Sequence, residues 1–290
     1  MSMRAIKRLV PWRAKVYAKL VLSRVPVRYR FWQGMNLFVH GAMDRPEYAL
    51  QVMRSHLARL GWRDLCEKSV LELGPGDGLS TAVVARAYGA KQVILVDSGA
   101  FARTDPETYI ALAQFLRAQG IDAPALDDCV SSEQILQRCN ATYLTRGLQD
   151  LQHLPDACVD LVFSQAVLEH VRAADLQATL RETRRVLAPD GVCSHQVDLR
   201  DHLGGALNNL RFSDRTWEAG WMVSSGFYTN RVRFGEMLGM FAAAGFAYDL
   251  TDVQRWSQLP TRRSHLLPRF RDVPEADLTV SQFDILARRA

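Results

Sequence analysis

A glycine-rich turn between a short apolar run and a helical pattern is the part of this sequence best suited to chemistry. The run Val70–Leu73 leads into Gly74-Pro75-Gly76-Asp77-Gly78, after which Leu79-Ser80-Thr81 open the helical pattern. Glycines let the backbone approach a ligand closely and adopt positive φ, and the first N–H groups of a helix have no partner within it. Asp97 lies 23 residues beyond Gly74, at the end of the next apolar run, where a carboxylate can accept hydrogen bonds from both hydroxyls of a ribose. These residues predict a site for a nucleoside-containing cofactor.

Acidic residues around the turn narrow the choice of cofactor. The glycine spacing is G-x-G-x-G, and Glu72 stands two residues before the first glycine, whereas dinucleotide sites carry G-x-G-x-x-G. Glu72 and Asp77 would repel a pyrophosphate, but a zwitterionic methionine moiety beside a sulfonium cation tolerates or uses such acids. We therefore expect S-adenosylmethionine, bound by Glu72, Gly74, Gly76, Gly78 and Asp97.

Three further segments follow in order, namely Asp150-Leu151-Gln152-His153-Leu154-Pro155, Leu161–Val171 and Arg185–Gly191. Together with the turn and Asp97, they resemble the landmarks of the class I S-adenosylmethionine-dependent methyltransferases, in the methyltransferase type 11 group that acts mostly on small molecules. The resemblance covers about residues 66–200. It implies that the turn cradles the methionine part of the cofactor. It also implies cofactor contacts by Asp97 (ribose), Asp150 (adenine amine), Leu151 (backbone) and Ser164 (mouth of the fourth strand).

Candidate catalytic residues follow the fourth and fifth predicted strands. Methyl transfer is an in-line displacement, so much of the catalysis can come from positioning the acceptor. A base is needed when the attacking group is a hydroxyl or a protonated amine. His170, shortly after Ser164, is one candidate, and capping or packing of its turn is the alternative.

The stretch His195-Gln196-Val197-Asp198-Leu199-Arg200-Asp201-His202 supplies the other candidates. An Asp–His pair acting as base and orienter is the favoured interpretation, with His195, Asp198 and His202 as catalytic residues beside His170. His195 could instead be a satisfied residue of the sheet, and the group could serve local hydrogen bonding. A divalent metal is less favoured, because neighbouring side chains on a strand and a loop diverge. We therefore expect no metal.

The elements that must position these residues follow an α/β pattern. Apolar runs at Ser69–Leu73, Gln92–Val96, Thr142–Thr145, Val159–Ser164, Gly191–Val197, Phe246–Thr251 and Leu278–Leu286 read as strands. Helical patterns at Thr81–Tyr88, Ala174–Leu187 and 231–244 separate several of them. Such alternation predicts a doubly wound, Rossmann-like, mostly parallel sheet of seven strands with helices on both faces. Two insertions, 98–140 and 198–230, follow strand ends, where ligands of such sheets bind.

The insertion 198–230 combines aromatic, amide and guanidinium side chains. Its polar and aromatic residues are Asn208, Asn209, Arg211, Trp217, Trp221, Tyr228 and Asn230, with Arg231 directly after it. Flat rings beside amides suit a sugar or another polyhydroxylated acceptor, and they also suit an ordinary cover packed over the cofactor. We expect a lid, some of whose residues contact the acceptor.

Charge is concentrated at the amino terminus. Residues 1–43 hold nine of the 36 basic residues and no acid, although the net charge of the chain is only +5. Apolar residues between Ile6 and Val21 recur at helical spacing, which predicts an amphipathic helix with a basic polar face. Residues 1–30 could contact an anionic membrane surface, or the helix could pack on its own domain. We expect a basic helical arm or cap over residues 1–65, followed by a cofactor-binding domain over 66–290.

The cysteines and the length of the apolar runs indicate the class of protein. The five cysteines form no C-x-x-C pair, and no apolar run reaches 18 residues, so we expect a cytoplasmic protein, at most peripheral to the inner membrane surface. Without basic character in the body or an Asn/Asp-Pro-Pro-aromatic tetrapeptide, we do not expect a nucleic-acid substrate.

The predicted function is methyl transfer from S-adenosylmethionine to a hydroxyl or amine of a small-molecule or glycan-like acceptor. One alternative is a non-catalytic S-adenosylmethionine-binding module that recruits partners through its arm. A nicotinamide-dependent oxidoreductase is a further alternative, which the glycine spacing disfavours.

Overall fold

The structure, a computed structural model, describes residues 43–290 and contains one seven-stranded sheet in the order β3-β2-β1-β4-β5-β7-β6. Strands β1 to β5 are parallel, while β7 runs antiparallel to both β5 and β6. The strands are β1 (Ser69–Leu73), β2 (Gln92–Val96), β3 (Ala141–Leu144), β4 (Val159–Gln165), β5 (Leu187–Asp198), β6 (Phe246–Arg255) and β7 (Val280–Arg289). The expected mostly parallel α/β sheet is confirmed.

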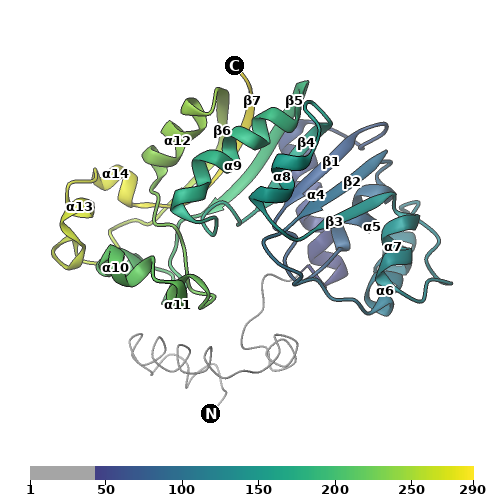
Figure 1. Cartoon of the computed structure of the whole chain (residues 1–290), viewed down its shortest axis with the longest axis horizontal. Helices are drawn as coiled ribbons and strands as arrows, with labels where there is room; N and C mark the ends of the chain where they lie inside the picture. Colours follow the sequence, from purple (N-terminus) through teal and green to yellow (C-terminus); the bar gives the residue numbers. More distant parts are fainter. Residues whose placement is uncertain (1–42) are drawn as a thin grey trace, which may run out of the picture.

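Helices cover both faces of the sheet (Figure 1). Helices α4 (Pro46–Leu60), α5 (Ser80–Ala87) and α6 (Pro106–Ala118) pack with one another on one face, and α7 (Ser132–Arg138) packs beside β3. The other face carries α8 (Leu148–His153), α9 (Ala173–Val186) and α12 (Phe234–Ala243). Successive side chains of a strand point to opposite faces, so the central strands contribute to two cores. Val70, Leu95 and Phe163 join the first core, and Leu71, Ile94 and Val162 join the second.

Helix α4 belongs to the core of the domain. Pro46 opens it and Gly61, at φ 67°, ends it in the left-handed conformation that favours glycine. Leu50, Met53 and Leu57 are buried in the same core as Val70 of β1. The segment expected to form an arm or cap therefore packs on the sheet over residues 46–60. The amphipathic helix expected between Ile6 and Val21, and the membrane contact expected of residues 1–30, lie outside the described residues.

One lobe beside the sheet is formed by two segments, residues 199–230 and residues 256–279. Residues 199–230 contain η1 (Asn208–Arg211), α10 (Asp214–Trp217) and α11 (Gly220–Val223). Residues 256–279 contain η2 (Arg263–His265), α13 (Pro268–Arg271) and α14 (Glu275–Leu278). Leu207 and Leu210 of the first of these segments share a buried cluster with Leu266, Phe270 and Leu278 of the second. We call residues 199–230 and 256–279 together the lid lobe, which Figure 1 shows around α10, α11, α13 and α14.

Within residues 43–290, no helix has the length and apolar character needed to cross a membrane.

Candidate active site

The glycine-rich turn between β1 and α5 adopts a conformation that depends on its glycines. Gly74 and Gly76 have φ values of 68° and 64°, in the left-handed region where a Cβ costs free energy. A Cβ on Gly74 would also lie 2.6 Å from the Val167 side chain. The Gly74 N–H donates to the Val96 carbonyl at 2.8 Å, which joins the turn to the end of β2. Gly78 lies on the other side of the turn, where a Cβ would be 3.4 Å from the Met43 backbone.

Asp97 connects the turn to the loop after β2. Its Oδ2 accepts the Gly76 N–H at 2.9 Å, and its Oδ1 accepts the Ser98 N–H at 2.7 Å. The residue is 9% exposed. Each carboxylate oxygen can accept more than one hydrogen bond, so Asp97 can hold the turn and still accept from the hydroxyls of a ribose. Its predicted role fits this position.

Glu72 is a buried acid directly beneath the turn. Burial raises its pKa to about 8, the nearby Asp97 charge adds to the rise, and a hydrogen bond with Thr81 opposes it. The side chain is 2% exposed, and its Oε2 has no hydrogen-bond partner among residues 43–290. A buried oxygen without a partner is costly, and a cationic group at the turn would remove that cost. The residues present therefore fit the cationic methionine part of S-adenosylmethionine.

The adenine contacts implied by the resemblance fall on α8. Asp150 is in its first turn, and its carboxylate accepts from the Arg146 backbone N–H at 2.8 Å and from Arg146 Nε at 2.7 Å. Burial raises the pKa of Asp150, but the hydrogen bonds from Arg146 outweigh it and the pKa is lowered overall. Leu151 is buried, and its carbonyl accepts from Arg185 at 3.0 Å. The adenine contacts of Asp150 and Leu151 stay predictions.

Ser164 and His195 face each other inside the sheet. They are paired across β4 and β5, with Ser164 Oγ 2.8 Å from His195 Nδ1. Both are fully buried, and burial lowers the pKa of His195 to about 3. The His195 ring lies 5.8 Å from the Phe241 ring of α12. This position matches the alternative in which His195 is a residue of the sheet, bonded to Ser164 through Nδ1, although its Nε2 has no hydrogen-bond partner within residues 43–290.

His170 and His202 are brought together although 32 residues separate them. Their Nε2 atoms are 3.1 Å apart, and their rings are stacked with a 3° angle between the planes. His170 follows β4, and His202 lies in the lid lobe. Both residues are exposed. The structure thus joins two of the four predicted catalytic residues at the carboxyl edge of the sheet.

The two acids of the His195–His202 stretch, Asp198 and Asp201, bind partners other than the histidines. Asp198 is held by Arg200, whose Nη2 and Nε lie 2.7 Å and 2.8 Å from its two oxygens. Asp201 is buried and accepts backbone N–H groups of Leu203, Ala206 and Asn208, which shapes the start of the lid lobe. The pairing observed for His202 is with His170. Within the described part of the chain, no group of three or more His, Cys, Asp or Glu residues converges as a metal site.

Glu169 is a buried acid after the carboxyl end of β4, and it was not among the site residues predicted from the sequence. Its Oε1 accepts the Asp198 N–H at 3.3 Å, and its carbonyl accepts the Asn230 N–H at 2.7 Å. Burial and the nearby charge of Asp198 raise its pKa well above the usual range. The signal that could have identified Glu169 is an acid at the end of a buried strand, which is the signal that identified Glu72.

The lid lobe is anchored to the turn after β4. Asn230 Nδ2 donates to the carbonyls of Leu168 and Val171 at 2.7 Å and 3.0 Å. His170 Nδ1 lies 2.8 Å from the Tyr228 carbonyl, and the Tyr228 hydroxyl accepts the Ala173 N–H at 3.2 Å. These contacts fix the lobe against the residues that carry His170.

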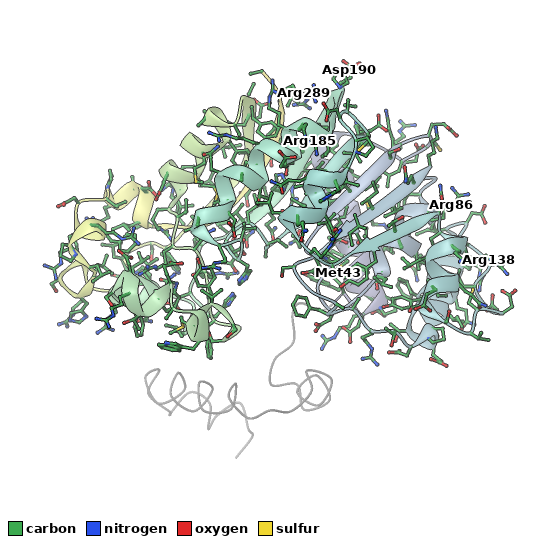
Figure 2. The ribbon with its side chains drawn as sticks, in the orientation of Figure 1. Met43, Arg86, Arg138, Arg185, Asp190 and Arg289 are labelled. Atoms are coloured by element: carbon green, nitrogen blue, oxygen red, sulfur yellow. The ribbon has the colours of Figure 1, made fainter. Side chains whose placement is uncertain are left out.

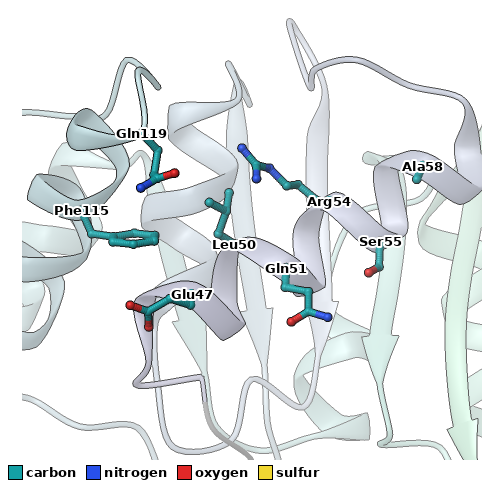
Figure 3. A pocket seen from close by; sticks show the side chains of 8 residues that line it. All are labelled: Glu47, Leu50, Gln51, Arg54, Ser55, Ala58, Phe115 and Gln119. Carbon is teal, nitrogen blue, oxygen red and sulfur yellow. The ribbon is translucent and has the colours of Figure 1, made fainter.

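A shallow groove lies elsewhere, between α4 and α6. It is lined by Glu47, Leu50, Gln51, Arg54, Ser55, Ala58, Phe115 and Gln119 (Figure 3). None of the site residues predicted from the sequence lines it.

Comparison with known proteins identifies a domain within the chain. Residues 71–194 match the family model described as a methyltransferase domain. No curated protein sequence matches the chain at a significant level.

Several solved structures are similar to the chain. The YcgJ protein of Bacillus subtilis is 17% identical, with a TM-score of 0.44 over 84% of this chain and 99% of that one. An S-adenosylmethionine-dependent methyltransferase of Mesorhizobium loti is 21% identical, with a TM-score of 0.44 over 85% and 100%. The 1,6-didemethyltoxoflavin-N1-methyltransferase of Burkholderia thailandensis, solved with 1,6-didemethyltoxoflavin and S-adenosylhomocysteine bound, is 18% identical, with a TM-score of 0.47 over 94% and 89%.

The matched region runs from Leu71 of β1 to Ser194 of β5 and contains the glycine turn, Asp97, β2, β3 and β4. Over residues 71–194 the chain therefore matches a methyltransferase domain.

Proposed function

We propose that the enzyme methylates a hydroxyl or amine of a small-molecule or glycan-like acceptor, and that the His170–His202 pair takes up the acceptor's proton. The contact between the two rings at the carboxyl edge of the sheet carries this proposal. The same edge carries the glycine turn and Asp97.

The partners of the pair determine where its protons lie. A carbonyl only accepts hydrogen bonds, so His170 Nδ1, 2.8 Å from the Tyr228 carbonyl, carries a hydrogen. Neutral His170 then has its lone pair on Nε2, and His202 Nε2, 3.1 Å away, must donate to it. His202 therefore has its own lone pair on Nδ1. A proton taken up at His202 Nδ1 can be shared with His170 across the Nε2–Nε2 contact.

A shared proton suits a general base for methyl transfer. When bound, the cofactor supplies an electrophilic methyl group on a sulfonium leaving group. The acceptor oxygen or nitrogen would form a bond to the methyl carbon with its own lone pair, while the carbon–sulfur bond would break and leave the electron pair of that bond on sulfur. The acceptor proton passes to the histidine pair. An imidazole is suited to this step because it titrates near neutral pH.

The surface of the lid lobe favours a polar acceptor. Of its aromatic and polar residues, Trp217, Tyr228, Asn209 and Asn230 are buried, together with Arg231 directly after it. Trp221 is 40% exposed, and Asn208 and Arg211 are half-buried. Arg211 Nη1 donates to Asn208 Oδ1 at 3.2 Å, and this guanidinium–amide pair, on the same lobe as the exposed Trp221 ring, supports contact with a polyhydroxylated molecule.

A labelled-methyl experiment tests the proposal. Purified enzyme is incubated with deuterated-methyl cofactor and fractionated cell extract, and mass spectrometry detects acceptors that gain one labelled methyl group. Fragmentation then identifies the methylated atom. Transfer to oxygen or nitrogen is expected. Methylation of carbon, or no transfer by enzyme that binds the cofactor in calorimetry, would contradict the proposal.

A further inference from the structure

His170 and His202 meet by the Nε2 ends of their rings. The two Nε2 atoms are 3.1 Å apart, while the ring centroids are 4.9 Å apart and the ring planes differ by 3°. Because the centroids are farther apart than the Nε2 atoms, each ring directs its Nε2 end toward the other. Both residues are exposed, unlike the buried His56 and His195. The contact is therefore accessible to small ions in the solvent.

The separation of the two nitrogens is close to that of two ligands on one metal ion. Zinc binds histidine nitrogen at about 2.0–2.1 Å in tetrahedral geometry, which places two such nitrogens about 3.3–3.4 Å apart. The observed Nε2–Nε2 distance of 3.1 Å is slightly shorter than this value. An ion could thus be bound by both rings after only a small shift of either side chain.

The backbone that carries each histidine is held in place before any ion binds. The Asn230 amide donates to two carbonyls of the turn that carries His170, at 2.7 Å and 3.0 Å. The carboxylate of Asp201, directly before His202, accepts three backbone N–H groups. Groups that are ordered in advance lose less conformational freedom on binding, which favours a site with two ligands.

The second nitrogen of His170 makes the kind of hydrogen bond that supports a metal ligand. His170 Nδ1 lies 2.8 Å from the Tyr228 carbonyl, so it carries a hydrogen and the lone pair is on Nε2. Histidines that bind metals usually donate their other ring N–H to a carbonyl or carboxylate, which fixes the tautomer. His202 reaches the same tautomer when its hydrogen moves from Nε2 to Nδ1 by exchange with solvent.

The two histidines come from different segments of the chain. Divergence of neighbouring side chains disfavours a metal site within the His195–His202 stretch alone, but His170 lies outside that stretch, on the turn after β4. Among the described residues, no third His, Cys, Asp or Glu converges with the pair. A site of imidazole nitrogens suits Zn²⁺, Cu²⁺ and Ni²⁺, whereas Mg²⁺ and Ca²⁺ prefer oxygen ligands.

We propose that His170 and His202 bind one divalent transition-metal ion, such as Zn²⁺, through their two Nε2 atoms. Each Nε2 lone pair forms one bond to the ion, and water fills the other coordination positions. The hydrogen of His202 stays on its ring at Nδ1, so two neutral rings release no proton. With the ion bound, neither ring has a lone pair left to take up a proton. Binding of the ion does not depend on the proposed function, but it would inhibit the proposed transfer.

Calorimetry on the untagged full chain measures the Zn²⁺ affinity in the presence of excess Mg²⁺. Loss of a residue that only orients a ligand weakens metal binding about 10- to 100-fold, so loss of a ligand should weaken it at least about tenfold. We expect this loss in His170→Gln and in His202→Gln, and the double variant should be no weaker than either single one. His153→Gln and His265→Gln, at exposed positions, are the matched controls and should keep the wild-type affinity.

Nitrogen NMR of the wild-type chain identifies the ligating atoms without any substitution. Zn²⁺ should shift the Nε2 resonances of both His170 and His202 more strongly than those of His153 and His265. Equal Zn²⁺ affinities in the wild type and both single variants, or a shift confined to one ring of the pair, would overturn the inference. Methyl transfer that is unaffected by Zn²⁺ bound at the pair would contradict the proposed role of the pair as the base, and the metal site would stand.

Discussion

His170 and His202 lie with their Nε2 atoms 3.1 Å apart, so the turn after β4 and the insertion after β5 meet through two imidazole rings. The Tyr228 carbonyl orients His170 from the far end of the same insertion. The lid lobe therefore contacts the turn after β4 and sets the tautomer of a candidate base. Loss of either ring removes the shared proton and leaves the cofactor turn intact.

Replacing either histidine should lower the rate of transfer without weakening cofactor binding. We expect kcat to fall by about 10²- to 10⁴-fold in His170→Gln and in His202→Gln, the range typical of a lost general base. The double variant should be little worse than either single one, because the two rings act as a unit. Single-turnover rates with labelled cofactor measure this effect, and calorimetry measures cofactor affinity. His265→Gln, at an exposed position of η2, is the matched control. Full activity in both single variants would remove the pair from the mechanism.

The carboxylate of Asp97 should contribute to cofactor affinity. Asp97→Ala removes the acceptor expected for the ribose hydroxyls and the hydrogen bond that holds Gly76 N–H. Charge-assisted hydrogen bonds of this kind contribute about 1.5–3 kcal/mol each, so we expect affinity for S-adenosylmethionine to fall at least tenfold. Calorimetric titration of the folded variants with S-adenosylmethionine measures this loss of affinity.

Asp190→Ala is the control for Asp97→Ala. Asp190 is exposed and lies at the opposite edge of the sheet from Met43, which adjoins Gly78 (Figure 2). Equal affinities of the Asp97→Ala and Asp190→Ala variants would place the ribose elsewhere.

The fold around the glycine turn was predictable because its signals are local. The turn, Glu72 and Asp97 lie at the ends of two short apolar runs, and β1 and β2 have the predicted bounds. Strand, tight turn and helix follow from apolar residues and glycines within a single stretch of chain. Residues 256–279 show no local pattern of this kind, because their short helices α13 and α14 are held by packing against residues 199–230.

The acceptor half depends on contacts between distant segments. Period-2 alternation placed His195 on a strand, but its burial follows from the register that pairs it with Ser164. Asp201 precedes Gly204 and Gly205, a turn signal that agrees with its role in accepting three backbone N–H groups. The His170–His202 contact depends on Asn230 and Tyr228, which anchor the lobe from far along the chain.

Glu72 should make the stability of the cofactor-free enzyme fall as pH rises. Its pKa of about 8 in the folded state exceeds the ordinary value of 4.5, so the unfolded chain loses this proton first. The stabilising effect is complete below pH 4.5 and is lost as pH rises through about 8. The slope from this one group is at most about 1.4 kcal/mol per pH unit.

Glu72→Gln should flatten this dependence, since an amide mimics the protonated acid and does not ionise. Urea unfolding at several values between pH 5 and pH 8 measures the difference between variant and wild type. The variant should gain stability relative to wild type as pH rises. Curves that stay parallel over this range would show that Glu72 is already ionised in the folded enzyme.

The two buried histidines should have the opposite effect and weaken the fold in acid. Burial lowers the pKa of His195 to about 3 and holds that of His56 well below its ordinary value of 6.5. The unfolded chain therefore binds protons below pH 6.5 that the folded enzyme does not. Their stabilising effect is complete above pH 6.5 and is lost as pH falls toward these lower values. In His195→Gln the free energy of unfolding should be lower than wild type at pH 8, because the contact with Ser164 is changed. That deficit should shrink between pH 6.5 and pH 4.5, as measured by urea unfolding. The exposed His153 provides the control His153→Gln, whose difference from wild type should stay constant. A deficit for His195→Gln that is equally constant would mean that His195 takes up its proton without unfolding.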